Sequence, residues 1–127
     1  MSGLKLKDME NKEFSKRLEE RTKVFARQVI RLSACLPNDV EGKVIRNQLT
    51  KSGTSIGANY REANRARSRA DFRNKARISE SEATETCYWL EIIRDLSWVE
   101  HEIIDPVFNE ADELLAIFTS IGKSLYT

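Results

Sequence analysis

Apolar residues recur every three or four positions along four successive stretches of the chain, and this periodicity constrains the fold more than any other feature. Residues with this spacing lie on one face of an α-helix. The stretches run from about Phe14 to Cys35, from Asp39 to about Ala66, from Ser68 to about Ile93, and from Asp105 toward the C-terminus. The sequence therefore predicts four amphipathic helices, each with one face directed into a shared core.

Helix-breaking and capping residues separate the predicted helices. Pro37 ends the first, and Asp39 offers a side-chain oxygen to the free amides at the start of the second. Ser68 is the predicted N-cap of the third helix. Asp105 is the predicted N-cap of the fourth, with Pro106 at its first helical position. The four helices are thus expected to have defined ends and short connections.

The short connections favour helices that run antiparallel to their neighbours in the chain. Five glycines and two prolines in 127 residues are too few turn formers for an all-β fold. We therefore expect an all-α fold, a single-domain antiparallel up-down four-helix bundle over residues 14–127. Residues 1–13 are expected to form a polar N-terminal extension.

Two glycines, Gly53 and Gly57, share one face of the second predicted helix. Each costs about 1 kcal/mol relative to alanine inside a helix, and a close approach of another helix is the usual compensation. The third predicted helix is the expected neighbour because it carries small residues on its seam, namely Ser79, Ala83 and Thr86.

The formal net charge of +1 conceals two segments of opposite charge. Residues 41–77 contain ten basic and three acidic residues, whereas residues 78–127 contain two basic and eleven acidic ones. A near-neutral total therefore does not argue against binding to a polyanion, because the positive charge is concentrated in one part of the chain.

The densest positive charge surrounds the predicted connection between the second and third helices, and we call it the Arg-rich end. Its members are Arg61, Arg65, Arg67, Arg69, Arg73, Lys75 and Arg77. Like charges four residues apart on a helix repel, which favours an anionic counterpart. The candidates are a nucleic-acid backbone, an acidic partner protein, or the acidic fourth helix of a neighbouring subunit. A merely solvated end of the bundle is the alternative.

Residues suited to catalysis or to binding a cofactor are few. The single histidine, His101, excludes a carboxylate-bridged di-iron site, which needs two Glu-x-x-His pairs. Cys35 and Cys87 have no CxxC spacing for zinc, and both are expected in or near the core. We expect no cofactor and no metal. Arg94 and His101 resemble the Arg-x4–6-His signature of HEPN-type ribonucleases, which leaves an enzymatic alternative.

No apolar run approaches the ~18 residues of a membrane helix, and the polar start of the chain does not have the pattern of a signal peptide. The sequence therefore predicts a cytoplasmic protein that does not associate with membranes.

Three motifs carry a resemblance to a known family. They are SGTSIGANYREA at residues 52–63, RARSRADF at residues 65–72, and EATETCYWLE at residues 82–91. Together they resemble the bacterial four-helix bundle family named after the 23S rRNA intervening sequences in which some members are encoded (S23-like proteins). The resemblance extends from about Phe25 to Phe118. The family's usual Asn-Ile-Ala-Glu-Gly is replaced by Asn-Tyr-Arg-Glu-Ala at residues 59–63, as in a more Arg-rich subgroup.

The resemblance implies an up-down four-helix bundle that assembles as a cyclic homo-oligomer, a pentamer in some members, with no established enzyme activity. A distantly similar bundle serves as a basic, pentameric accessory protein that engages nucleic acid and a reverse transcriptase. We therefore expect a non-catalytic homo-oligomer or adaptor that binds RNA or DNA through its Arg-rich end. The alternatives are a purely structural or protein-interaction bundle with charge-paired subunits, and a HEPN-like ribonuclease.

Overall fold

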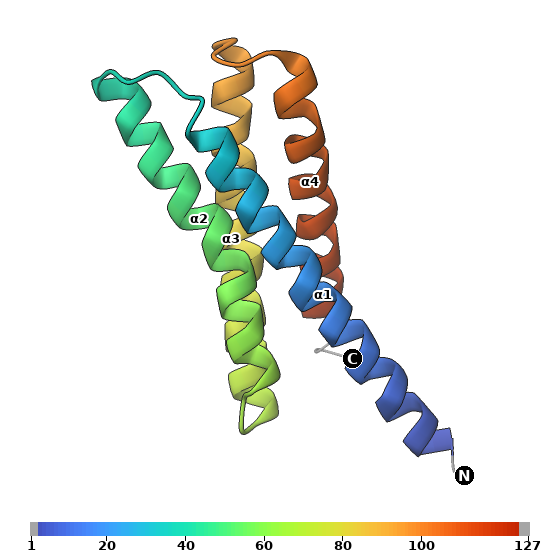
Figure 1. Cartoon of the computed structure of the whole chain (residues 1–127). Coiled ribbons are helices and arrows are strands. Elements are labelled where there is room, and N and C mark those ends of the chain that lie inside the picture. The colour runs from blue at the N-terminus through green and yellow to red at the C-terminus, as the bar shows by residue number, and fades with distance from the viewer. Residues whose placement is uncertain (1–2, 125–127) are drawn as a thin grey trace.

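The computed structural model describes the backbone of residues 3–124 and the side chains of residues 11–124. This part of the chain contains no strand and forms four helices: α1 (Gly3–Ser33), α2 (Val40–Asn64), α3 (Arg69–Asp95) and α4 (His101–Ser124). Each helix packs against the next, and α1 also packs against α4, so the four close into an up-down bundle (Figure 1). The predicted fold class is confirmed.

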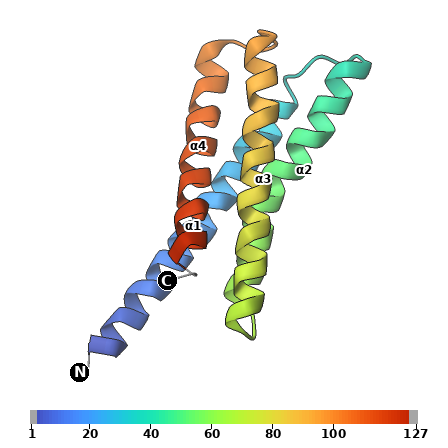
Figure 2. The ribbon, with the colours of Figure 1, turned by 180° about the vertical axis from the view of Figure 1, so that it is seen from behind.

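The bundle is open at the end where α2 turns into α3. There the α2–α3 hairpin projects past the end of α4, while the N-terminal part of α1 runs past the bundle in a diverging direction (Figures 1 and 2). The described part of the molecule therefore ends in a fork, with α1 as one prong and the α2–α3 hairpin as the other.

Helix α1 begins at Gly3 rather than near Phe14, where the apolar periodicity begins. The residues between them are mostly Lys, Glu, Leu and Met, which are good helix formers without needing a buried face. Periodicity marks the part of a helix that packs, and the helix itself can continue beyond it. The predicted N-terminal extension is thus largely a continuation of α1.

One face of each of the four helices contributes to the core. Its fully buried large side chains include Phe25, Leu49, Tyr60, Leu90, Leu114 and Phe118. The rings of Tyr60 and Phe118 meet edge to face with centroids 5.3 Å apart, which joins α2 to α4 across the bundle. None of the four helices, over the residues described, is long and apolar enough to cross a membrane.

The two glycines of α2 lie against α1, not against α3 as the sequence suggested. A Cβ atom at Gly53 would lie 2.7 Å from Cγ1 of Val29, and one at Gly57 would lie 2.7 Å from Oγ1 of Thr22. The predicted close approach is therefore confirmed and its predicted partner was wrong. Since α1 crosses α2 obliquely, the bare backbone is needed at that crossing.

The contact between α2 and α3 is close for a different reason. The Ser79 hydroxyl donates to the carbonyl of Ile56 at 2.9 Å, and the Thr86 hydroxyl donates to Oγ of Ser52 at 3.0 Å. These buried hydroxyls satisfy one another or the backbone across the interface. Small polar residues, rather than glycines, thus join α2 to α3.

Two of the three predicted caps are present. Asp39 accepts a hydrogen bond from the amide of Gly42 at 2.7 Å, and Ser68 accepts one from the amide of Asp71 at 3.1 Å. The predicted cap at Asp105 was wrong because α4 begins at His101.

The first turn of α4 is held by the carbonyl of Glu100, which accepts from the amides of Ile103 and Ile104. Ile104 is fully buried and anchors this turn in the core. Pro106 therefore lies inside the helix, where its missing amide removes one backbone hydrogen bond. Burial of the preceding turn outweighs the preference of proline for the first helical position.

Candidate nucleic-acid interface

The Arg-rich end forms the tip of the α2–α3 hairpin. Helix α2 ends at Asn64, where the amide of Arg65 is bonded to the carbonyls of Ala63 and Glu62, and α3 begins after the Ser68 cap. Ala63, in the last turn of α2, is buried. Most of the long basic side chains that follow it in the chain are exposed to solvent.

The seven predicted binding residues are brought together on this tip. Two of them, Arg73 and Lys75, are half-buried. The other five are exposed: Arg61, Arg65, Arg67, Arg69 and Arg77. Two acidic residues within the same segment, Glu62 and Asp71, are too few to neutralise seven cations. The tip of the hairpin, which Figure 2 shows as the lower end of α2 and α3, therefore carries a net positive charge.

Two of the seven cations have acidic partners that the distances define. Nζ of Lys75 lies 2.9 Å from Oε2 of Glu62, and this hydrogen bond raises the pKa of Lys75. Nε of Arg61 lies 3.6 Å from Oε1 of Glu19 on α1. Arg69, Arg73 and Arg77 also take part in contacts within the chain. Arg65 and Arg67, which lie in the connection itself, are exposed.

A groove between α1 and α2 adjoins this tip, and the sequence reading did not find it. It consists of two neighbouring hollows of about 300 and 310 Å³ that share Glu19 as a lining residue. We call it the α1–α2 groove. Its charged lining residues are Lys12, Lys16, Glu19, Lys23 and Arg61. Lys12, Lys16 and Lys23 are spaced four and seven residues apart on α1, so they share one face of the helix. Their position opposite Arg61 becomes evident only from the fold.

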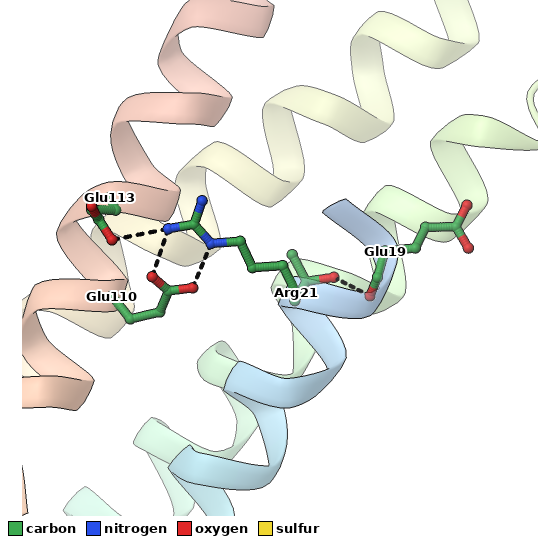
Figure 3. Close-up of polar contacts among 5 residues, drawn as sticks. Glu19, Arg21, Glu110 and Glu113 are labelled. Atoms are coloured by element: carbon green, nitrogen blue, oxygen red, sulfur yellow. Dashed lines mark hydrogen bonds and ion pairs between the residues drawn. The ribbon is translucent and has the colours of Figure 1, made fainter. Parts of the chain in front are cut away.

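The other flank of α1 carries an ion-pair cluster that faces α4. Nε and Nη2 of Arg21 each donate to Glu110 at 2.7 Å, and Nη2 also donates to Glu113 at 2.9 Å. The Arg21 hydrogen bonds hold the pKa of Glu110 below its usual value. Figure 3 shows that Arg21 and Glu19 point to opposite sides of α1. Part of the acidic C-terminal half is therefore neutralised within the chain.

Arg94 and His101, the two residues of the ribonuclease-like motif, each contact a different residue of α4. The guanidinium of Arg94 lies over the ring of Phe108, 4.0 Å from its centroid. Nδ1 of His101 lies 3.9 Å from Asp105, and the imidazole is exposed to solvent. Among the residues described, no group of three or more His, Cys, Asp or Glu side chains could hold a metal ion.

The two cysteines differ in their surroundings. Cys35 is exposed, so the prediction that both lie in or near the core was wrong for this one. Cys87 is buried, and its thiol donates to Oδ1 of Asp112 at 3.6 Å. Burial and the nearby carboxylate of Asp112 raise the pKa of Cys87 to about 12. This thiol stays protonated at neutral pH and is a poor nucleophile.

The chain is similar to proteins of one family. A sequence profile of the 23S rRNA-intervening sequence proteins matches residues 15–120. The fold is similar to that of a protein with unknown function from the S23 ribosomal protein family of Bacteroides thetaiotaomicron VPI-5482. That comparison gives a TM-score of 0.78 and 38% sequence identity, and it covers 86% of this chain and 97% of the other. No curated protein matches the chain.

Proposed function

The chain belongs to the 23S rRNA-intervening sequence protein family, and from that premise we propose that it is a non-catalytic, homo-oligomeric bundle that binds RNA or DNA through its Arg-rich end. One observation carries the proposal: five exposed arginines lie around the tip of one hairpin. Arginine suits this task because its planar guanidinium donates two parallel hydrogen bonds to a phosphate group. Such contacts favour a nucleic-acid backbone over a particular base sequence.

The proposal predicts an affinity that depends steeply on salt. If each of the five exposed arginines neutralises one phosphate of a single strand, the slope of log K against log salt is about −3.5. Affinity should then fall about 100-fold between 50 and 200 mM salt. Fluorescence anisotropy of a labelled RNA and a labelled DNA of mixed sequence measures both quantities. No binding at 50 mM salt would overturn the proposal.

A pair of matched variants locates the contact. Arg65→Gln with Arg67→Gln removes two exposed cations from the hairpin tip, and Arg31→Gln with Lys43→Gln removes two exposed cations from the opposite end of the bundle. The first pair should reduce the salt slope by about 1.4, on every sequence alike, and the second should leave it unchanged. Equal effects of the two pairs would show that only net charge matters.

A second candidate is charge-paired assembly of subunits. The exposed acidic residues near the α3–α4 connection, Asp95, Glu100 and Glu102, lie at the end of the bundle opposite the Arg-rich end. A heterologous contact could pair the two ends. Light scattering at 50 and 500 mM salt tests this, since such an oligomer should dissociate at high salt. A monomer at both concentrations would refute it and the homo-oligomeric part of the main proposal.

A further inference from the structure

The α1–α2 groove owes its shape to small side chains on both helices. Ala26 of α1 and Gly57 and Ala58 of α2 line it, so the backbones approach closely and the space above them stays open. A Cβ atom at Gly57 would collide with Thr22, which shows how closely the two backbones approach below the groove. The groove is thus a direct consequence of the close crossing of α1 and α2.

Positive charge dominates the lining of the groove. Three lysines of α1 and Arg61 of α2 line it, against the single carboxylate of Glu19. That carboxylate is already engaged, since Nδ2 of Asn64 donates to it at 2.9 Å and Nε of Arg61 lies 3.6 Å away. Lys16 and Lys23 are exposed at the rim. An anion in the groove would therefore meet several cations and one carboxylate that is already hydrogen-bonded.

The groove also continues into the Arg-rich end. Arg61 and Asn64 line it from the last turn of α2, and the next residue along the chain is Arg65. From there α1 diverges from the α2–α3 hairpin, so the groove opens into the fork (Figure 1). A polyanion bound at the hairpin tip could continue along α1 past Lys16 and Lys23, with Glu19 as the one carboxylate that lines the groove.

We propose that the α1–α2 groove binds the sugar-phosphate backbone of a single nucleic-acid strand, with Lys16, Lys23 and Arg61 contacting successive phosphates. This inference rests on the proposed function and extends its site. Hollows of about 300 Å³ are at the lower limit of ligand pockets and admit one strand rather than a duplex. Proteins that bind single strands commonly use a positively charged groove that follows the backbone.

The test compares three variants that each remove two positive charges. They are Lys16→Gln with Lys23→Gln in the groove, Arg65→Gln with Arg67→Gln at the tip, and Arg31→Gln with Lys43→Gln as the control. Binding of 6- and 20-nucleotide single strands is measured by anisotropy from 50 to 200 mM salt. The groove variant should bind the long strand about 10–25-fold more weakly at 0.1 M salt, with a slope reduced by about 1.4. It should bind the short strand, which the tip alone can hold, as the wild type does.

The outcomes separate this inference from the proposed function. Absence of binding by the wild type overturns the proposed function. Normal binding of the long strand by the groove variant, with weakened binding by the tip variant, overturns the groove alone. The reverse pattern would overturn the tip as the site and support the groove.

A variant that removes a negative charge from the groove, and should therefore increase affinity, provides an independent check. Glu19→Gln removes the one carboxylate that lines the groove and releases Arg61, so it should tighten binding of the long strand about threefold to tenfold. Glu20→Gln is the matched control, because Glu20 is the exposed neighbour that does not line the groove. Unchanged or weaker binding by Glu19→Gln, in a variant whose circular dichroism matches the wild type, would contradict the proposal.

Discussion

The two flanks of α1 use their charges in opposite ways. On the flank toward α4, Arg21 makes three charge-assisted hydrogen bonds to Glu110 and Glu113. On the flank toward α2, the cations outnumber the one carboxylate, Glu19, that lines the groove. Charge therefore holds α1 to α4 where α1 closes the bundle, whereas the flank that crosses α2 keeps an excess of cations.

The largest expected effect comes from forcing the α2 flank apart. Gly53→Val should destabilise the protein by about 3 kcal/mol, because its Cβ would lie 2.7 Å from Cγ1 and 2.9 Å from Cγ2 of Val29. Urea unfolding followed by circular dichroism measures the loss.

Gly122→Ala in α4 is the control for the glycine substitution. The nearest atom to a Cβ there is Oε1 of Glu80, at 3.8 Å, so alanine fits without displacement. This variant should be stabilised by about 0.5–1 kcal/mol through helix propensity alone. A Gly53→Val variant as stable as the wild type would show that the crossing has room to adjust.

The α4 flank should show an intermediate effect. Arg21→Gln should lower the free energy of unfolding by about 1 kcal/mol at pH 7. The estimate is modest because the Arg21 side chain is 39% exposed and solvent screens part of the interaction. Nucleic-acid affinity should stay close to that of the wild type, since this flank lies on the other side of α1 from the groove. A loss of affinity larger than that of the Arg31→Gln, Lys43→Gln control would show that this flank of α1 also takes part in binding.

The pH dependence of that stability has a defined sign. The pKa of Glu110 is lowered in the folded protein by its hydrogen bonds from Arg21. A carboxylate with a depressed folded pKa contributes stability above its unfolded pKa, about 4.3, and loses it as pH falls through the folded value. The difference between the wild type and Arg21→Gln should therefore be present at pH 7 and shrink toward pH 3. Urea midpoints at the two pH values measure this, and a constant difference would contradict the assignment.

The smallest stability effect should come from Glu19→Gln on the α2 flank. Its hydrogen bond from Asn64 can be kept by the amide oxygen, and its contact with Arg61 is long and largely exposed. We expect a change of about 0.5 kcal/mol or less in the free energy of unfolding. A loss as large as that of Arg21→Gln would mean that both flanks serve cohesion.

Local patterns were enough to predict the four helices, two of their N-caps and the Arg-rich end. A cap such as Ser68 depends on residues within one turn, and the seven cations of the tip are close together in the sequence. Both features can be predicted from the sequence because neither depends on contacts with residues that are distant in the chain.

Several failures of the sequence-based predictions concern contacts between residues that are distant in the chain. Gly53 shows that some helix must come close, but only the crossing angle decides that the helix is α1. The groove lysines of α1 could not be predicted as neighbours of Arg61 either, because their position opposite Arg61 depends on the angle at which α1 crosses α2. The start of α4 was misplaced because burial of Ile104 outweighed the local preference of Pro106.

The Arg21–Glu110 contact joins residues 89 positions apart in the chain. The other helix pairs, α1–α2, α2–α3 and α3–α4, are neighbours in sequence and can form by closing short loops. Docking of α1 on α4 requires the longest loop and is favoured as a late event in folding. Arg21→Gln should then accelerate unfolding while leaving the folding rate nearly unchanged, so that this ion pair acts mainly on the lifetime of the closed bundle.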